Sequence, residues 1–484
     1  MSACRSARNP GALVISENAV GAAADEEDPR RYDLVLDEAV EIAKRWLDGV
    51  FDRPIPPSAE IEQVKSALGR QLPADGDDPR DVIVRLAAEV EPGVMAMQSP
   101  RFYGWVIGGT YPAALAADWL VSTWDQNTAM RAVTPGVVAV EELAGEWVVD
   151  LLGLPSGAEV GFVTGATMAN FVGMSAGRQR VLAQAGWDAN RDGLAGGPKV
   201  RFIVGAERHG SVDIAGRYLG LGAPTVVDAD DQGRILVDRL REVLPASNEP
   251  AIVCLQAGNL HSGAFDDFGA AIAVAHEAGA WVHIDGAFGL WAGATPGLRH
   301  LTSGYEAADS WATDGHKTLN VPYDCGIAIV SSPDAVHEAF GMRANYLQAA
   351  QTGTDPHERV PELSRRARGV PLWAALSSLG RLGVEQLIDG LAANAAALAR
   401  GLVELDGVEI LNDVVYTQVC MSLPDDARTT AVGQRLREDG VVLASPSRWR
   451  DRDVLRFSVS NWATDDADIA ATVEAVRRAI AARP

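Results

Sequence analysis

The stretch "GFVTGATMANFVGMSAGRQRVLAQAG", residues 161–186, places a short apolar run in front of a long alanine-rich segment. This pattern predicts a buried strand followed by a helix. The same order recurs at 200–222, where "VRFIVG" precedes "SVDIAGRYLGLG", and at 250–279, where "PAIVCLQAG" precedes "DFGAAIAVAHEAG". Repeated strand–helix units indicate an α/β fold with a mostly parallel sheet that helices cover on both faces. Sheets of this kind bind ligands at the carboxyl ends of their strands.

The composition of the 484-residue chain is that of a globular protein, with 47% hydrophobic and 22% charged residues. The formal net charge of −23 repels nucleic acid and anionic lipid, so we expect neither as a partner. The four cysteines are scattered and show no CxxC spacing, which favours neither disulfides nor a zinc site. No apolar run reaches the ~18 residues of a membrane span, and the N-terminus lacks the pattern of a signal peptide. We therefore expect a cytoplasmic protein that does not bind a membrane.

Changes in composition and hydrophobic periodicity along the chain predict four structural regions. Residues 1–31 resemble a flexible tail, and residues 32–95 carry the periodicity of amphipathic helices that need another surface, such as a second subunit, to pack on. Residues 96–374 contain the strand–helix units and form the large domain. Residues 375–484 predict a separate, small α+β domain, with a long helix, short strands and a final helix.

Two of the predicted strands end in residues that suit a ligand. In "TGATMAN", residues 164–170, Gly165, Ala166 and Thr167 stand at a strand–helix turn, where backbone N–H groups and the helix dipole bind anions. Thr167 is equally well suited to cap the helix. In "ERHGSVD", residues 207–213, His209 is either a polar loop residue or a ring that stacks on a flat ligand.

The next two strand ends carry a carboxylate and an amine. Asp285 ends the apolar run in "AWVHIDGAFGLW", residues 280–291, where an ionised carboxylate needs a partner. Lys317 follows in "DSWATDGHKTLNVPYDCG", residues 309–326. An anion cradle, a histidine, a carboxylate and a lysine, in that order, match the phosphate, the ring, the ring nitrogen and the aldehyde of pyridoxal 5′-phosphate.

From about residue 95 to the C-terminus, the chain resembles the group II pyridoxal-phosphate-dependent decarboxylases, which include the aromatic-amino-acid, histidine and glutamate decarboxylases. The segments that carry the resemblance are "PRFYGWVIGGTYPAALAADWL", "TPGVVAVEELAGEWVVDLLGLP", "QAGNLHSGAFDDF", "VHIDGAFG", "HKTLNVPYDCG" and "SRRARGVPLWAALSSLG". The resemblance implies the fold of aspartate aminotransferase, known as fold type I. It also implies a homodimer with the active site at the subunit interface.

The resemblance also implies a role for each matched residue. Lys317 is the residue that condenses with the cofactor aldehyde, and Asp285 keeps the ring nitrogen protonated. His209 stacks on one face of the ring and Ala287 contacts the other. The remaining cofactor contacts are Gly165, Ala166 and Thr167 at the phosphate, His316 near it, and Asn259 at the ring hydroxyl.

The main departure from the family pattern lies in residues 346–366. Decarboxylases of this family generally place a tyrosine in this loop to protonate the substrate carbon after CO2 leaves. Here no tyrosine follows Tyr346, and His357 falls near the expected position. His357 is either the proton donor or a solvated loop residue.

The segment "SPRFYGWV", residues 99–106, bears on which substrate side chain the pocket accepts. Arg101, Phe102 and Trp105 match the region that lines the pocket in relatives. The aromatic side chains favour an apolar or aromatic substrate, whereas Arg101 favours an acidic one. The aromatic residues also suit an ordinary core.

The predicted activity is decarboxylation of an L-amino acid to an amine and CO2. One alternative keeps the cofactor but yields an aldehyde by oxidation, or breaks another Cα bond as a lyase or aldolase does. A second alternative is a cofactor-binding dimer without catalysis, which the retained Lys317 and Asp285 disfavour.

Overall fold

The computed structural model describes residues 32–244, 249–342 and 353–482. The predicted tail, residues 1–31, and Tyr346 lie outside the described residues. Within those ranges, no helix combines the length and the apolar character needed to cross a lipid bilayer.

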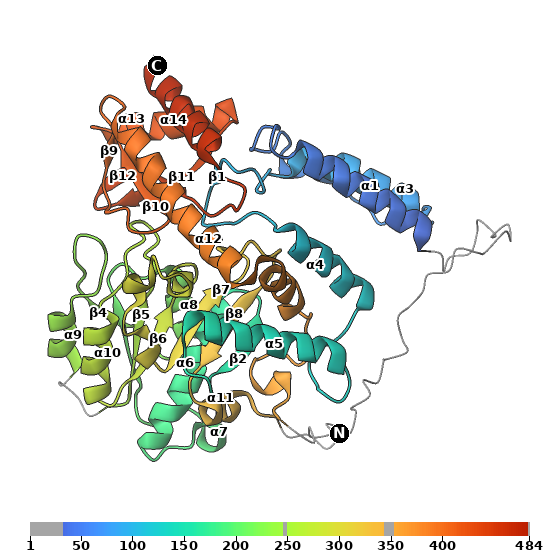
Figure 1. Ribbon diagram of the computed structural model, residues 1–484. Coiled ribbons are helices and arrows are strands. Elements are labelled where there is room, and N and C mark those ends of the chain that lie inside the picture. Colours follow the sequence, from blue (N-terminus) through green and yellow to red (C-terminus); the bar gives the residue numbers. More distant parts are fainter. Residues whose placement is uncertain (1–31, 245–248, 343–352, 483–484) are drawn as a thin grey trace, which may run out of the picture.

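The large domain is built on a seven-stranded sheet with the strand order β2-β8-β7-β6-β5-β3-β4 (Figure 1). Only β8 runs antiparallel to its neighbours in this described sheet, so the predicted mostly parallel α/β architecture is confirmed. The strands are β2 Glu159–Val163, β3 Arg201–Gly205, β4 Thr225–Val227, β5 Ala251–Gln256, β6 Trp281–Asp285, β7 Ser310–Asp314 and β8 Gly326–Val330.

Helices cover both faces of this sheet because its strands are apolar on both sides. Ile203, Val253 and Leu255 point into a core shared with α5, α10 and the first part of α12. Their neighbours Phe202 and Ile252 point into a second core shared with α6, α8 and α11. The helices are α4 Pro112–Trp124, α5 Pro135–Leu152, α6 Ala166–Gln184, α7 Ala189–Asp192, α8 Gly210–Tyr218, α9 Val237–Val243, α10 Phe268–Glu277, α11 Pro333–Phe340 and α12 Gly369–Val403.

A smaller, five-stranded sheet lies beyond the C-terminal half of α12 (Figure 1). Its order is β1-β11-β12-β10-β9, and its first strand comes from the start of the range predicted for the large domain, ahead of α4. The elements are β1 Phe102–Tyr103, β9 Glu409–Ile410, β10 Gln418–Ser422, α13 Asp426–Asp439, β11 Leu443–Trp449, β12 Arg452–Ser458 and α14 Asp466–Ala481. The predicted domain boundary at 374/375 falls inside α12, and this helix is kinked at Gly380, where φ is 63°.

The N-terminal helices form an arm beside α4 (Figure 1). They are α1 Asp33–Gly49, α2 Ile61–Leu68 and α3 Pro79–Val90, and none of the three contains a fully buried residue. Their apolar faces are therefore only partly covered in the single chain, and Leu34, Leu36 and Leu86 are exposed.

Candidate active site

One cavity of about 330 Å³ lies at the carboxyl ends of the strands in the large sheet. Its volume falls within the range of roughly 300–1,000 Å³ that small-molecule sites occupy. Lys317 and Asp285 both line it, together with His209, Ala287 and His316. The structure thus brings the lysine and the carboxylate, which are separated along the chain, to the walls of the same hollow.

Lys317 follows β7, and its amine approaches the last residue of that strand. The Nζ atom lies 3.1 Å from Oδ2 of Asp314, a carboxylate that is only 1% exposed. His316 Nε2 lies 3.5 Å from the same oxygen. Oδ1 of Asp314 is buried and finds no hydrogen-bond partner within the described part of the chain. Oδ2 of Asp314 therefore contacts both Lys317 and His316, while Oδ1 stays without a hydrogen-bond partner among the described residues.

His316 is held as a neutral ring beside this carboxylate. The backbone N–H of Cys325 donates to His316 Nδ1 at 3.1 Å, which puts the ring hydrogen on Nε2, toward Asp314. Burial lowers the pKa of His316 and outweighs the opposite effect of Asp314. The ring therefore faces the cavity as a hydrogen-bond donor and not as a cation.

The backbone that carries Lys317 is clamped by Asn320. Asn320 Oδ1 accepts from the N–H groups of Gly109 and Trp462, while Nδ2 donates to the carbonyl oxygen of Ser460. The φ of Asn320 is 53°, in the left-handed region that asparagine tolerates better than most residues. The lysine loop is thereby attached both to the segment before α4 and to the end of β12.

Asp285 ends β6 with one protein donor on each carboxylate oxygen. The N–H of Ala287 donates to Oδ1, and Nδ2 of Asn170 donates to Oδ2, both at 3.2 Å. Two donors stabilise the ionised form and leave lone pairs free toward the cavity. The arrangement suits a carboxylate that receives a further N–H from a ligand.

His209 precedes α8 and caps it. Its Nδ1 accepts the backbone N–H of Ser211 at 3.2 Å, so the ring hydrogen is on Nε2. Burial lowers the pKa of His209, and the negative charge of Asp285 opposes that shift only in part. A neutral, flat ring at the cavity wall suits stacking on another ring.

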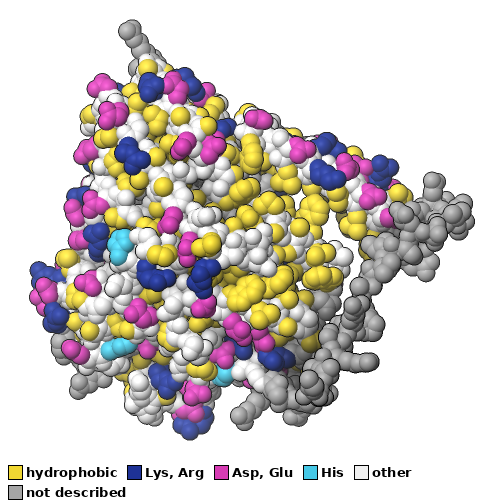
Figure 2. All heavy atoms as spheres, viewed as in Figure 1, with side chains coloured by type: hydrophobic (Ala, Val, Ile, Leu, Met, Phe, Trp, Pro, Cys, Tyr) yellow, Lys and Arg dark blue, Asp and Glu magenta, His cyan; other side chains and the backbone are white. Residues whose placement is uncertain are grey.

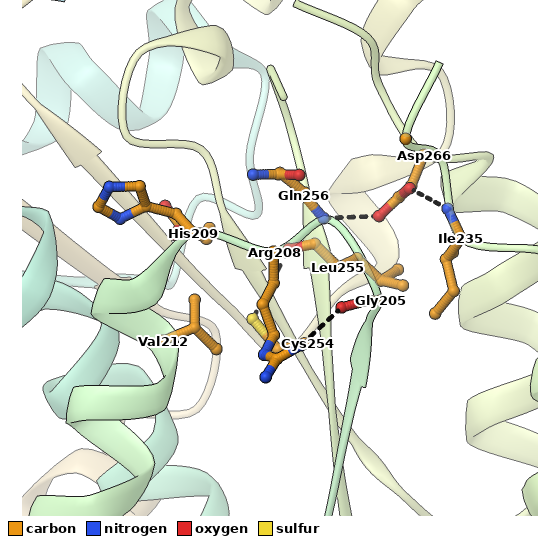
Figure 3. Close-up of a pocket in the computed structure, with 11 residues that line it drawn as sticks. Gly205, Arg208, His209, Val212, Ile235, Cys254, Leu255, Gln256 and Asp266 are labelled. Atoms are coloured by element: carbon orange, nitrogen blue, oxygen red, sulfur yellow. Dashed lines mark hydrogen bonds between the residues drawn. The ribbon is translucent and has the colours of Figure 1, made fainter. Parts of the chain in front are cut away.

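A smaller pocket lies next to the main cavity, between His209 and the end of β5 (Figure 3). Asp266 accepts the backbone N–H groups of Gln256 and Ile235 there, each at 2.7 Å. Burial raises the pKa of Asp266 to about 6. The hydrogen bond from the backbone N–H of Gln256 to Asp266 fixes the position of Gln256, and Gln256 in turn lines the main cavity.

The N-terminus of α6 forms the part of the cavity wall next to Asp314. Gly165 is the N-cap residue and provides no side-chain cap, which leaves the first amides of a 19-residue helix for a ligand. The alternative in which Thr167 caps the helix is therefore excluded, since Thr167 lies in the first turn and lines the cavity. A Cβ at Gly165 would lie 3.4 Å from His316 Cε1 and 3.8 Å from Asp314 Oδ1, so glycine leaves this space open.

Trp105 lines the cavity, but the other two predicted substrate contacts do not. The guanidinium of Arg101 binds Asp468 at 2.7 Å and also donates to the carbonyl oxygen of Phe51. Phe102 is buried in a core with Ile55 and Leu443. Arg101 and Phe102 thus contact the small sheet and the N-terminal region, because β1 pairs with β11 there.

Asn259 and His357 also lie outside the residues that line the cavity. Asn259 Oδ1 accepts the N–H groups of His261 and Ser262, and Nδ2 donates to the carbonyl oxygen of Glu207. The buried side chain of His357 has no partner at Nδ1 among the described residues.

Several residues that line the cavity, or that support its walls, escaped the sequence prediction. Asp314 and Gln256 end predicted strands, so their positions alone could have indicated them. Asn170 reaches Asp285 from the second turn of α6, and no local sequence signal shows that contact. Leu260 and Phe288 complete the apolar part of the wall.

These residues fit pyridoxal phosphate. The lysine amine and the two-donor carboxylate line a cavity of sufficient size, and the uncapped amides of α6 meet the open space at Gly165. The donor set thus contains a partner for each functional group of the cofactor. Fold and site together define a pyridoxal-phosphate-dependent enzyme of fold type I.

Comparison with known proteins identifies the family. Residues 62–424 match the pyridoxal-dependent decarboxylase conserved domain, and the chain belongs to that family. It is 27% identical over 432 residues to the cysteine sulfinic acid decarboxylase of Mus musculus, covering 85% of each chain. It is 26% identical over 475 residues to the aromatic-L-amino-acid decarboxylase of Rattus norvegicus, covering 93% of this chain and 97% of the relative.

A solved structure has the same fold. Oryza sativa TDC with PLP and tryptamine superposes with a TM-score of 0.88 at 22% identity, over 94% of this chain and 99% of the other. The protein is thus a carboxy-lyase of the amino-acid decarboxylase family that uses pyridoxal phosphate.

Proposed function

We propose that the protein decarboxylates an L-amino acid with an apolar or aromatic side chain to an amine and CO2. The observation that carries the proposal is the single cavity that Lys317 and Asp285 share. Trp105, Leu260 and Phe288 supply its apolar wall. The described lining contains no arginine, and Arg101, the cation expected to serve an acidic substrate, is paired with Asp468. The named relatives include both substrate classes, and the absence of an arginine from the described lining is the observation that favours the apolar or aromatic class.

When bound, pyridoxal phosphate supplies an aldehyde that condenses with amines and a ring that accepts the electron pair left behind by CO2. Lys317 supplies the amine for that aldehyde. Asp314 Oδ2, 3.1 Å from Nζ, orients the amine and can accept its proton. Asp285 holds a proton at the ring nitrogen, which keeps the ring able to accept electrons. His209 and Ala287 are assigned to the two faces of the ring.

The phosphate and the ring hydroxyl have their own partners in this assignment. The first amides of α6, from Ala166 and Thr167, are assigned to the phosphate, and the ring of His316 is assigned a place beside it. For the hydroxyl, the side-chain Nε2 of Gln256 takes the place of Asn259, because Gln256 lines the cavity and Asn259 does not. Asn259 Oδ1 accepts from His261, and Asn259 Nδ2 donates to Glu207 and to Gln256 Oε1 at 3.2 Å. The role of His357 as proton donor stays a prediction.

The direct test is a screen of the twenty amino acids with separate detection of CO2, amine, aldehyde and hydrogen peroxide. We expect CO2 and amine in equal amounts, and the highest kcat/KM with an aromatic or large apolar amino acid. Turnover of acidic amino acids alone would overturn the substrate class. Aldehyde and peroxide in place of amine would instead establish the oxidative alternative.

We also propose that a second copy of the chain covers the N-terminal arm. An apolar groove of about 490 Å³ runs between α1, α3 and α4, where Trp46, Leu86 and Trp119 line it. Figure 2 shows hydrophobic side chains gathered between this arm and the body of the protein. Helices without a buried residue need such cover, and the family resemblance supplies the partner, a homodimer.

Oligomeric state tests the covered groove. Analytical ultracentrifugation of the wild type should give twice the chain mass of 51.2 kDa. A Leu86→Glu, Trp119→Glu double variant should sediment as a monomer, because two charges would be buried in an apolar contact. Tyr218→Glu, at an exposed side chain that ends α8 and lies outside the groove, is the control and should stay dimeric. A wild-type monomer, or a dimer that survives both groove substitutions, contradicts this proposal.

A further inference from the structure

A chain of buried polar side chains leads from Asp285 away from the cavity, into the layer between α6 and the sheet. Asn170 Nδ2 lies 3.2 Å from Asp285 Oδ2, and Asn170 Oδ1 lies 2.9 Å from His283 Nε2. His283 Nδ1 lies 2.8 Å from Ser310 Oγ, which lies 2.9 Å from Trp281 Nε1. All five residues are at least nine-tenths buried. We call these residues the relay; only Asp285 among them lines the cavity.

The chemistry of the end groups fixes the direction of every hydrogen bond in the relay. An ionised Asp285 can only accept, so Asn170 turns its amide N–H toward it and its carbonyl oxygen toward His283. His283 must then carry its hydrogen on Nε2 and accept at Nδ1. Trp281 can only donate, so Ser310 Oγ accepts from Trp281 and donates to His283. Every bond therefore points its hydrogen toward Asp285.

The ring in the middle of the relay is neutral. Burial lowers the pKa of His283 to about 3, so that one ring nitrogen is left to accept at physiological pH. The remaining N–H of Asn170 has Ser211 Oγ as its acceptor, at 3.4 Å. Each polar group in the relay thus has a partner that matches its role.

Glycines on α6 allow the relay to form. A Cβ at Gly173 would lie 2.6 Å from His283 Nδ1, and a Cβ at Gly177 would lie 2.6 Å from Trp281 Cδ1. Any larger residue would push α6 off β6. The helix therefore packs directly on the two aromatic rings of the relay.

The reverse direction requires a neutral Asp285. Its hydroxyl would then donate to Asn170 Oδ1 after rotation of the amide, and the amide N–H would donate to His283 Nε2. His283 would have to carry its hydrogen on Nδ1 and donate to Ser310. The position of one hydrogen on His283 therefore records the charge on Asp285, two residues further along the same strand.

We propose that Asn170, His283 and Ser310 are positioning residues that keep Asp285 ionised and aimed into the cavity. This inference rests on the proposed function of Asp285 as the partner of the ring nitrogen. It adds that Asp285 is held by a chain of hydrogen-bond donors on the side away from the cavity, and not only by the ligand inside the cavity.

Nitrogen-15 NMR of histidine-labelled protein tests the order of the relay without any activity measurement. The His283 signals are identified by their loss in His283→Gln. We expect a hydrogen on Nε2 and a bare Nδ1, with and without pyridoxal phosphate. A hydrogen on Nδ1, or on both nitrogens, would overturn the proposal.

Two variants of equal size test its effect on the cofactor. In Asn170→Thr the hydroxyl can accept from His283 and donate to Asp285, whereas Asn170→Val can do neither. We expect Asn170→Val to lower kcat on the order of tenfold to a hundredfold with little change in KM, and to shift the visible absorption band of the bound cofactor. Asn170→Thr should restore most of both. Equal behaviour of the two variants would overturn the relay.

Gln179→Leu is the control, because Gln179 is also a buried polar residue of α6 but binds Asn190 and not Asp285. It should lower the melting temperature and leave the absorption band and kcat unchanged. If the wild type binds pyridoxal phosphate and decarboxylates while Asn170→Thr and Asn170→Val behave alike, the relay fails and the proposed function stands. If the wild type neither binds nor decarboxylates, the proposed function fails, and the His283 tautomer still tests the relay.

Discussion

Asp314→Asn should change how the protein distinguishes pyridoxal phosphate from pyridoxal, which lacks the phosphate. The carboxylate of Asp314 is buried at the end of β7, and its Oδ1 has no partner among the described residues. That oxygen would lie 3.8 Å from a Cβ at Gly165, so it faces the uncapped end of α6. A phosphate bound at those amides is repelled by the Asp314 charge.

The size of the effect follows from Coulomb's law. Two unit charges ~5 Å apart in a medium of effective dielectric constant ~20 repel by about 3 kcal/mol. Lys317, 3.1 Å from Asp314, cancels much of this repulsion. We therefore expect a net change of about 1.4 kcal/mol, which is about tenfold in the dissociation constant.

Isothermal titration of the apoenzyme with both ligands measures the effect. The ratio of the two dissociation constants isolates the phosphate, because loss of the Lys317 ion pair acts on both ligands alike. Asp314→Asn should favour pyridoxal phosphate over pyridoxal about tenfold more than the wild type does. Asp309→Asn is the control, since Asp309 precedes the same strand and binds the N–H of Val282 instead. An unchanged or smaller ratio in Asp314→Asn would refute the placement of the phosphate beside this carboxylate.

Three further outcomes are expected. Lys317→Ala should lose both turnover and the visible band of the covalently bound cofactor with its circular dichroism intact, and a retained band would contradict the role of the lysine. Asp285→Asn should lower kcat at least ~100-fold in a protein that still binds the cofactor, because a neutral amide holds the ring-nitrogen proton poorly; wild-type turnover would refute that role. Burial lowers the pKa of His283 to about 3 and of His261 to about 4, so these rings bind protons in the unfolded chain below pH ~6.5 but not in the folded protein. Each ring should then lower the free energy of unfolding by about 1.4 kcal/mol per pH unit as pH drops from ~6.5 toward 4. Asp266, whose pKa burial raises to about 6, acts in the opposite direction below pH ~6 and offsets one of the two rings. A net fall of about 1.4 kcal/mol per pH unit is therefore expected, and urea unfolding that is flat across this range would contradict it.

The strand–helix order of the large domain could be predicted because each unit is encoded locally. The runs at 161–186 and 250–279 each contain an apolar strand followed by small helical residues, and both periodicities are visible without a partner. Residues that follow such strands reach the same edge of the sheet, so Asp285 and Lys317 could be placed near each other before any coordinates were known.

Contacts between distant segments could not be predicted in this way. Arg101 binds Asp468, a residue 367 positions away, and nothing in "SPRFYGWV" shows whether the arginine faces the cavity or the small sheet. Asn170 follows a recognised anion-binding turn, but the helical rotation that turns it onto Asp285 depends on the packing of α6 against β6. Asn259 follows a strand end, yet its side-chain Oδ1 accepts the backbone N–H groups of His261 and Ser262 in a tight turn. The local composition does not show that this turn forms.

The course of α6 sets a length as well as a position. Its first amides and Asn170 are held on the same rigid rod, and the four-residue step from Ala166 to Asn170 corresponds to a rise of about 6 Å. The distance between the phosphate site and the site of the ring nitrogen would therefore be fixed by a single helix. An analogue of pyridoxal phosphate with one extra methylene between ring and phosphate could bind at one of these sites only by losing its contact with the other.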